Sequence, residues 1–224
     1  MSHVQVQPHN ILDTADALFE AQGYDNTTLR DIAQQVDIPL ELLERDYACK
    51  DEIALAIYQQ LSEQSHELAQ TIASAPISEM YYTVLEQRLS LLTDHSEVSS
   101  ILFANAMRPQ ARITASDIAP GSRDPIMQIM HCIVDKASDK PKRGAEDLTL
   151  FLYAFHFLVV VFWLYDRTDN KTASHMFTSF LRDLLKTLQP MLVLPLLRKA
   201  LTNMAKIMMV IVGGARLVDK PKKS

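Results

Sequence analysis

Side chains able to hold a phosphate group are gathered between residues 27 and 50. Thr27 and Thr28 precede a short amphipathic segment, and hydroxyls and backbone N–H groups at the start of a helix can bind anions. Arg30, Arg45 and Lys50 are the only cations among the first 75 residues. Donors of these kinds hold the backbone of nucleic acids, so the segment predicts an interface with DNA.

The same segment carries carboxylates at the positions where phosphates would lie. In "DIPLELLERDYACKDEI" (37–53), the acidic residues are Asp37, Glu41, Glu44 and Asp46, with Arg45 among them. A glutamate can accept a hydrogen bond from cytosine N4, so one carboxylate in a groove is compatible with base reading. Three carboxylates on one short helix, however, would be repelled by the negative charge of the phosphates. Two hypotheses follow: a DNA-binding protein that draws on other basic groups, or a scaffold that has lost DNA binding.

The net charge of −5 is distributed unevenly along the chain. Residues 1–75 hold 13 Asp and Glu against 3 Lys and Arg, whereas residues 76–224 hold 14 against 19. The last stretch, 191–224, has 7 basic residues and one acidic residue. Because phosphate neutralisation supplies much of the affinity for DNA, a DNA-binding domain is normally the basic part of a chain. Here it would be the acidic part.

Helical periodicity is the main signal along the chain, and no segment shows convincing strand alternation. Gly23 ends the first helix, Thr27 is the expected N-cap of the second, and Pro39 suits the first turn of the third. The predicted helices cover 9–22, 28–36, a short stretch from Pro39, about 50–75, 77–93, 96–108, 124–138, 145–167, 172–189 and 191–212. The predicted fold class is therefore all-α, with about ten helices and a sizeable buried core.

The pattern "ILDTADALFEAQGYDNTTLRDIAQQVDIP", followed by Lys50, resembles the TetR family of dimeric, ligand-responsive bacterial regulators. The matching residues are Ile11, Ala15, Leu18, Phe19, Gly23, Tyr24, Thr27, Thr28, Ile32, Ala33, Leu43 and Lys50. A looser match covers 162–185, where the family closes one helix with a Trp and an Asp and packs the next helix against the partner subunit. The resemblance implies a helix-turn-helix head (1–50) and a helical ligand-binding and dimerisation domain (51–190).

The resemblance also implies which residues face DNA, with the third helix entering the major groove. These are Thr27, Thr28, Arg30, Pro39, Leu40, Glu41, Glu44, Arg45 and Lys50. The sequence departs from the family pattern here: Asp37 replaces the usual Gly, Pro39 the usual Ser, and Glu44 the Tyr that grips phosphate. Glu41 stands at a small position and Asp46 at a position usual for His. The buried residues match the family, while the DNA-facing residues have lost their donors.

In the family a ligand is held between the connecting helix and the later helices of the body. Candidate lining residues are Leu85, Leu89, Phe103, Met107, Met127, Met130, His131, Phe155, Val159 and Phe162. Each of them also suits an ordinary core position. As a set, many Met and Phe side chains with few charges favour an apolar or lipid-like small molecule, because Met adapts to irregular shapes.

Homodimerisation is predicted through the helices at 145–167 and 172–189, which two copies would bring into a four-helix bundle. The residues predicted at the dimer interface are Leu152, Phe155, Val160, Trp163, Phe177, Phe180, Leu181 and Leu184. The apolar run at 150–165 has 16 residues, fewer than the roughly 20 that span a bilayer, so a buried helix is favoured over a membrane span.

Residues 191–224 form an extra amphipathic C-terminal helix and basic tail that the family pattern lacks. Leu194, Leu197, Leu201, Met204, Met208 and Ile211 make one apolar stripe, with lysines on the opposite side. Such a helix packs either on the dimer or on an anionic membrane surface. The second possibility is similar to the TetR-fold lipid-binding accessory proteins of ubiquinone biosynthesis, and this similarity is one of architecture only.

The sequence carries no catalytic constellation: H-E-x-x-H, P-loop and G-x-S-x-G motifs are absent, so no enzyme and no cofactor are expected. No metal site is expected, because there is no cluster of Cys and His ligands. The favoured hypothesis is a cytoplasmic homodimeric repressor that binds DNA and is released by an apolar ligand. The alternative is a lipid-binding protein without DNA binding, peripheral at the membrane through residues 191–224.

Overall fold

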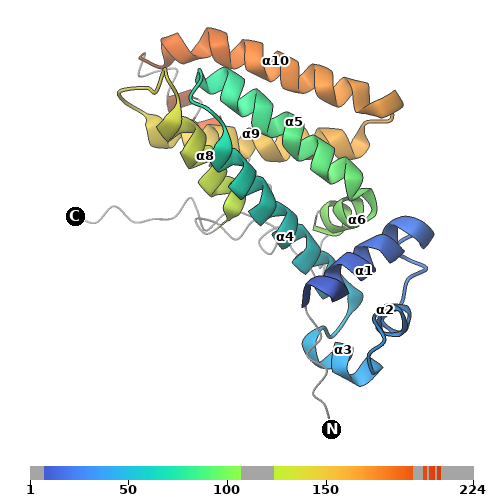
Figure 1. Ribbon diagram of the computed structural model, residues 1–224. Helices are drawn as coiled ribbons and strands as arrows, with labels where there is room; N and C mark the ends of the chain where they lie inside the picture. The colour runs from blue at the N-terminus through green and yellow to red at the C-terminus, as the bar shows by residue number, and fades with distance from the viewer. Residues whose placement is uncertain (1–7, 107–123, 194–198, 201, 205, 208–224) are drawn as a thin grey trace. The chain divides into compact units, whose positions relative to one another are not determined.

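The computed structural model describes residues 8–106, 124–193, 199–200, 202–204 and 206–207. These residues form nine α-helices and two short 3₁₀ helices, with no strand among them, which confirms the all-α prediction (Figure 1). The chain divides into two compact units. We call them the head unit (residues 1–61 and 92–118) and the body unit (residues 62–91 and 119–224). Helix α4 (Lys50–Thr71) contributes residues to both.

The head unit begins with α1 (Pro8–Gln22), which ends where Gly23 adopts a φ of +87° and donates its N–H to the carbonyl of Phe19. A glycine is needed there because a left-handed backbone is costly for residues with a Cβ. Helices α2 (Leu29–Val36) and α3 (Leu40–Asp46) follow, joined by a short turn. The core is apolar and includes Ile11, Ala15, Phe19, Ile32, Ala33, Leu43, Ile53 and Ile57.

Helix α6 (Ser96–Ala106) also belongs to the head unit, where it contacts α1 through polar side chains. His95 Nδ1 lies 2.6 Å from a carboxylate oxygen of Asp16, and Glu20 accepts the backbone N–H of Glu97 at 2.7 Å. Glu97 in turn accepts the N–H of Tyr24 at 3.1 Å. Residues more than 70 positions apart in sequence therefore hold α6 against the start of the chain.

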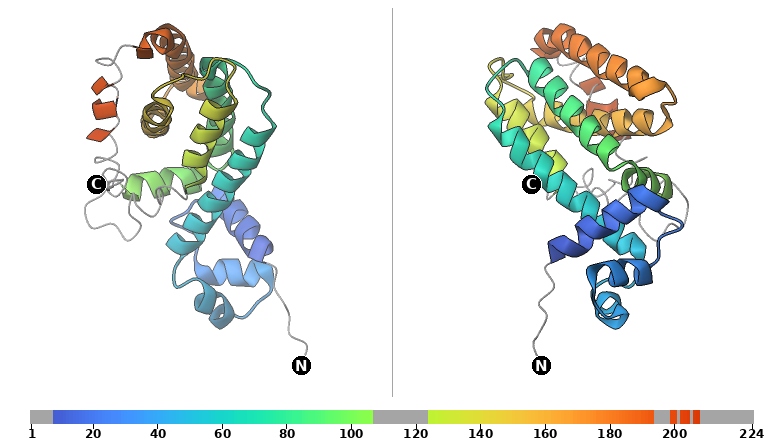
Figure 2. Two further views of the ribbon diagram at one scale, coloured as in Figure 1. Left: turned by 90° about the vertical axis from the view of Figure 1, so that its left-hand side faces the viewer. Right: turned by 45° about the vertical axis from the view of Figure 1, so that its right-hand side comes forward.

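The body unit is built around α9 (Ala145–Tyr165), which packs against α8 (Pro125–Lys136) and α10 (Thr172–Leu188) (Figures 1 and 2). Helix α9 is long and apolar enough to cross a membrane, but 61% of its most apolar window is buried within the protein. It is therefore the central core helix of the unit, as the sequence analysis predicted. Tyr81 of α5 (Ile77–Asp94) donates its hydroxyl to the carbonyl of Leu152 at 2.9 Å and ties α5 to α9.

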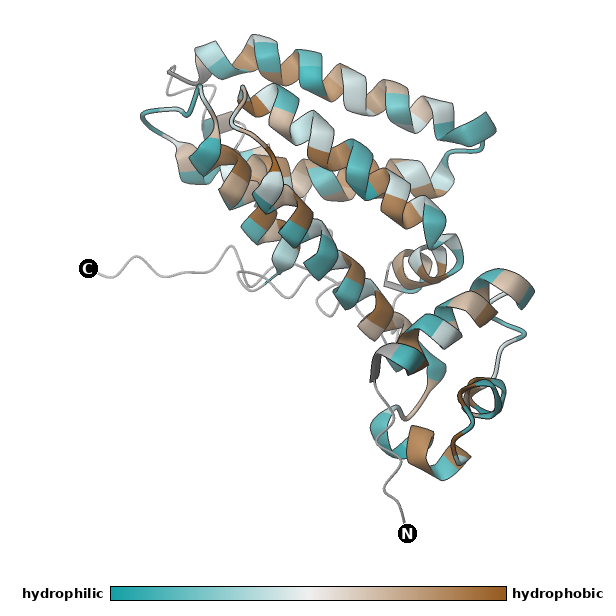
Figure 3. Cartoon of the chain, viewed as in Figure 1, coloured by the Kyte–Doolittle hydropathy of each residue, from teal (hydrophilic) through white to brown (hydrophobic). Residues whose placement is uncertain are grey.

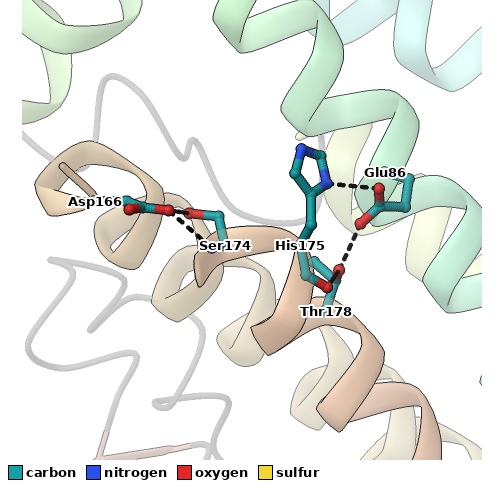
Figure 4. Close-up of polar contacts among 5 residues, drawn as sticks. All are labelled: Glu86, Asp166, Ser174, His175 and Thr178. Atoms are coloured by element: carbon teal, nitrogen blue, oxygen red, sulfur yellow. Dashed lines mark hydrogen bonds and ion pairs between the residues drawn. The ribbon is translucent and has the colours of Figure 1, made fainter. Parts of the chain in front are cut away.

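Asp166 forms the corner between α9 and α10. Its carboxylate accepts the N–H and hydroxyl of Thr168, at 2.9 and 2.6 Å. It also accepts those of Ser174, at 2.8 and 2.7 Å (Figure 4). Burial acts to raise the pKa of Asp166, but these bonds outweigh burial and hold the pKa below its usual range. Glu86 of α5 contacts two residues of α10. One of its carboxylate oxygens lies 2.7 Å from Nδ1 of His175, and the other accepts the Thr178 hydroxyl (Figure 4).

Several predicted helix ends differ from the structure. The helix predicted over 145–167 ends at Tyr165, because Asp166 leaves the helical conformation to form the corner. The helix predicted over 124–138 is α8, with Asp124 as its N-cap and Lys136 as its last residue. Instead of a new α-helix from residue 191, Gln189–Val193 form a 3₁₀ helix directly after α10. Pro190 in this stretch has no N–H to donate to an α-helical ladder.

The last predicted helix lies mostly outside the described residues. Residues 199–200, 202–204 and 206–207 are helical, and Lys199, Asn203 and Lys206 are exposed. Of the proposed apolar stripe, only Met204 has a described side chain, and it is 38% exposed. Leu194, Leu197, Leu201, Met208 and Ile211 lie outside the described residues.

Replacing Asp166 with alanine should destabilise the protein by about 2 kcal/mol, because four donors at the α9–α10 corner lose their acceptor. The matched control is Asp183→Ala, which removes an exposed carboxylate of α10 that pairs only with its neighbour Arg182. Its effect should stay within about 0.5 kcal/mol. Urea unfolding followed by circular dichroism measures both. Equal stability of the two variants would show that the corner does not depend on Asp166.

Candidate nucleic-acid interface

Helix α2 begins with a capping box formed by Thr28 and Asp31. The N–H of Asp31 donates to the Thr28 hydroxyl oxygen at 3.2 Å, and the N–H of Thr28 donates to the Asp31 carboxylate at 2.8 Å. Hydrogen bonds from Thr28 lower the pKa of Asp31. The N-cap is thus Thr28, one residue after the predicted Thr27. The Thr28 hydroxyl is exposed and also donates to the Asp31 carboxylate at 2.7 Å, so it can donate to a phosphate only by exchanging this bond.

Thr27, by contrast, is enclosed by the head unit. Its hydroxyl donates to the carbonyl of Gly23 at 2.9 Å and accepts from the Gln22 side chain at 3.1 Å. The prediction that the Thr27 hydroxyl reaches a phosphate is therefore not compatible with its position. Thr27 instead closes the loop between α1 and α2, and this role could not be told from its place beside Thr28 in the sequence.

The turn between α2 and α3 has the geometry that a helix-turn-helix requires. Asp37 adopts a left-handed backbone with φ +58° and ψ +48°, and the N–H of Ile38 returns to the carbonyl of Ala33 at 3.0 Å. Aspartate is one of the few non-glycine residues that tolerate this region, which explains how it replaces glycine here. Pro39 follows as the exposed N-cap of α3, one residue earlier than predicted.

Helix α3 presents its acidic residues to solvent. Leu43 is fully buried and holds the helix in the head, while Glu41 and Glu44 are exposed. Arg45 donates from Nε to the exposed carboxylate of Asp46 at 3.0 Å. The only cation of the helix is thus paired with its neighbour, and the exposed surface has three carboxylates against one guanidinium.

Lys50 is held by the protein itself. Its ammonium group donates to the carbonyl oxygens of Tyr24, Thr27 and Asp25 at 2.6, 3.1 and 3.3 Å. It also lies 4.3 Å from the centre of the Tyr24 ring, whose hydroxyl bonds to Asp51. An ammonium has three N–H donors, so the loop carbonyls can occupy all of them. Lys50 therefore clamps the α1–α2 loop to the start of α4 and is not placed as a free phosphate ligand.

Arg30 is the cation most available to DNA. It lies in the first turn of α2, is exposed, and makes no ion pair with any residue that the structure describes. Of the three cations in the first 75 residues, the structure thus commits Lys50 to the loop and Arg45 to Asp46. The exposed cations at this surface are therefore Arg30, which has no ion pair among the described residues, and Arg45, which pairs with Asp46.

The predicted ligand residues divide between the two units. Five are buried in the body unit: Leu85, Leu89, Met127, Met130 and Val159. Phe155 is half-buried, while Phe162 and His131 are exposed. Phe103 belongs to the head unit, where its ring meets that of Tyr58 edge-on at 5.4 Å. Met107 lies outside the described residues.

The predicted dimer residues also divide by burial. Leu152, Val160, Trp163 and Leu181 are enclosed within the single chain and serve its core. Phe155, Phe177 and Leu184 are half-buried, and Phe180 is 57% exposed. The large exposed apolar residues of these two helices are Leu158, Phe162, Tyr165, Met176 and Phe180. Hydrophobic and hydrophilic residues are interspersed along α10 (Figure 3).

These features define a class of protein. A three-helix head whose second and third helices form a helix-turn-helix, joined by α4 to an all-helical body, is the architecture of a helix-turn-helix regulator. Residues 11–57 match the family model of the bacterial regulatory proteins of the tetR family. Residues 11–57 are therefore similar to the helix-turn-helix domain of the tetR-family regulatory proteins.

Solved structures share the fold over most of the chain. A tetR-family transcriptional regulator from Streptomyces coelicolor is 14% identical with a TM-score of 0.62, and the match covers 91% of this chain and 90% of that one. A possible TetR family transcriptional regulator from Streptomyces coelicolor A3(2) is 19% identical with a TM-score of 0.52, covering 95% and 100%. A protein of unknown function from Rhodococcus sp. RHA1 is 14% identical with a TM-score of 0.53, covering 81% and 98%.

At these identities the likeness to solved structures shows the fold alone. The search of curated proteins found no matching relative.

Replacing Lys50 with methionine should lower the free energy of unfolding by about 2 kcal/mol, because charge-assisted hydrogen bonds to three loop carbonyls are lost. Arg30→Met is the matched control and should change stability by less than about 0.5 kcal/mol. Urea unfolding of the two variants makes the comparison. If Lys50→Met is as stable as Arg30→Met, then Lys50 is not a clamp and is available to phosphate.

Proposed function

We propose that this protein is a homodimeric DNA-binding transcriptional regulator that responds to an apolar small molecule. The observation that supports DNA binding is the helix-turn-helix: the α2–α3 turn keeps its geometry, and α3 lies on it with an exposed outer surface. A surface helix held in this way fits the major groove. We place the protein in the cytoplasm, where such a regulator meets DNA.

The residues proposed to face DNA come from two helices. The start of α2 offers Thr28 and Arg30 to the phosphate backbone, and the outer surface of α3 offers Pro39, Leu40, Glu41, Glu44 and Arg45 to the groove. Thr27 and Lys50 support this surface from within by fixing the α1–α2 loop. A carboxylate can accept a hydrogen bond from cytosine N4, so Glu41 or Glu44 would contribute to specificity at a cost in affinity.

A second candidate function is a ligand-binding scaffold of the same fold without DNA binding. The observation that favours it is the exposed surface of α3, where Glu41 and Glu44 form no ion pair with a described residue and Arg45 pairs with Asp46. In a complex with DNA, each carboxylate would be repelled by the nearby phosphates. Direct measurement of DNA binding at low salt, where electrostatic attraction is strongest, separates the two candidates.

The proposed homodimer uses the exposed apolar residues of α9 and α10. Phe162 and Phe177 lie 4.9 Å apart between ring centres, and Phe180 stacks near Phe177 at 6.4 Å. These rings form an apolar patch with Tyr165 and Met176. A patch of this kind on a soluble protein marks a surface that a partner covers. Two helices that meet their own copies about a two-fold axis bury such a patch in a four-helix bundle.

The proposed ligand lies in the body unit, among the buried residues of α5, α8 and α9. Leu85, Leu89, Met127, Met130 and Val159 supply the apolar side chains. A ligand that shifts these helices would change the position of α4, which runs into the head unit as one continuous helix. The two sites would then be coupled through a single rigid element.

Removing the charges of Glu41 and Glu44 should strengthen DNA binding. We expect E41Q/E44Q to bind a non-specific duplex at 20 mM salt about 10-fold more tightly than the natural protein, because two carboxylates near the phosphates are neutralised. The matched control, E63Q/E67Q, removes two exposed carboxylates of α4 and should change affinity less than about 2-fold. Fluorescence anisotropy measures all three proteins. Equal gains in both variants would mean that α3 does not face the DNA.

Replacing Phe180 with glutamate should convert the dimer to a monomer, because the charge would be buried in an apolar interface. Leu68→Glu is the matched control: Leu68 is a similarly exposed apolar residue of α4, 49% exposed, and its change should leave the dimer intact. Sedimentation analysis reports the mass of each variant. A dimeric Phe180→Glu protein would place the interface elsewhere.

A further inference from the structure

Six polar side chains are gathered in the body unit, next to the buried parts of α5 and α9, where most other buried side chains are apolar. We call them the buried polar cluster: Ser62, Ser65, Arg88, Asp124, Tyr153 and His156. They come from α4, α5, the N-cap of α8, and α9. Burying polar and charged groups costs free energy unless each is hydrogen-bonded, so the cluster requires a reason.

Arg88 places a positive charge inside the body unit. It is 2% exposed and donates to the hydroxyls of Ser62 and Ser65, each at 3.2 Å. Asp124 lies near enough for the Arg88 charge to affect its titration, and burial has the larger effect and raises the pKa of Asp124. Asp124 also accepts the N–H of Ile126 at 2.8 Å and the hydroxyl of Tyr153. These groups are thus linked to one another and to the start of α8.

His156 differs from the rest of the cluster. It is 1% exposed, and neither ring nitrogen has a hydrogen-bond partner among the residues that the structure describes. Burial, and secondly the charge of Arg88, lower the pKa of His156 to about 3. The ring is therefore neutral at pH 7, with one N–H donor and one acceptor nitrogen. Two unmet groups on one buried side chain are rare, because each costs about 1–3 kcal/mol.

The neighbours of His156 on its helix face are apolar. On α9, Leu152, Val159 and Val160 share its helical face at spacings of four residues before, and three and four after. On α5, Leu85 and Leu89 adjoin Arg88. The Phe157 ring meets His156 nearly edge-on at 5.4 Å. An oxygen atom brought here by a ligand would find a hydrogen-bonding ring within an apolar wall.

We propose that the body unit binds an apolar molecule with one oxygen head group, a hydroxyl or a carboxyl, which hydrogen-bonds to His156 beside Arg88. A hydroxyl or a carboxylic acid can donate to the acceptor nitrogen or accept from the N–H, and so satisfies one ring nitrogen, whereas a carboxylate accepts from the N–H and gains from the Arg88 charge. This rests on the proposed function as a ligand-responsive regulator and gives the chemistry of its ligand. His156 is then retained because it recognises the ligand, at the expense of stability in the free protein.

Three probes with one apolar frame test the proposal: butylbenzene, 4-butylphenol and 4-butylbenzoate. Isothermal titration calorimetry on the full-length protein without DNA should show at least one oxygenated probe binding 10-fold or more tightly than butylbenzene. His156→Phe should abolish this preference, and it should raise the melting temperature of the free protein because two unmet polar groups are removed. Which oxygenated probe binds more tightly tells a hydroxyl ligand from a carboxylate ligand.

His131→Phe is the matched control, because His131 is exposed on α8 and its change should keep the preference. If His156→Phe does not fold, His156→Leu provides the same comparison with a smaller apolar side chain. The proposal is overturned if the natural protein binds none of the probes or binds them equally, or if His156→Phe keeps the preference. Failure to bind DNA would remove the proposed regulatory function and leave this binding result standing, since no DNA is present.

Discussion

The clamp formed by Lys50 fixes the part of the protein on which DNA binding would depend. Lys50 opens α4 and holds three carbonyls of the α1–α2 loop, so the helix that leads to the body is fastened to the helix that precedes the helix-turn-helix. Leu43 of α3 and Ile32 of α2, both fully buried, complete the frame from the other side. Given this frame, the outer surface of α3 can change without unfolding the head.

That separation explains why an acidic α3 coexists with an intact helix-turn-helix. Carboxylates at Glu41 and Glu44 are exposed and cost little in the folded protein, because water solvates them. Their effect appears only when phosphates approach. In the body unit the relation is reversed: buried His156 costs stability in the free protein, and the proposed ligand would supply a hydrogen bond that its ring lacks among the described residues. Neither feature prevents folding, and each is proposed to act only when its partner binds.

The sequence predicted the frame better than the functional surfaces. Helical periodicity and caps fix α1, α2 and α5 to within a residue or two, since these signals are local. The roles of Lys50 and Thr27 could not be predicted from the sequence. A threonine or a lysine next to a helix start can equally well bind phosphate or hold a loop. Phe155 suits both the predicted ligand site and the predicted dimer interface for a similar reason: helical spacing gives a face but not what covers it. In the sequence, His156 is one polar residue within a long apolar helix, and only its burial without a hydrogen-bond partner among the described residues sets it apart.

The most direct test of the central claim, that this acidic head still binds DNA, is the salt dependence of binding to a duplex from upstream of the protein's own gene. We predict binding at low salt that weakens with a slope of about −2 in log affinity against log salt, because each neutralised phosphate contributes about −0.9. Each protomer of the proposed dimer would offer one exposed arginine, Arg30, which has no ion pair among the described residues of its head. The absence of any binding at 20 mM salt, by a protein that is folded and dimeric, would contradict the account.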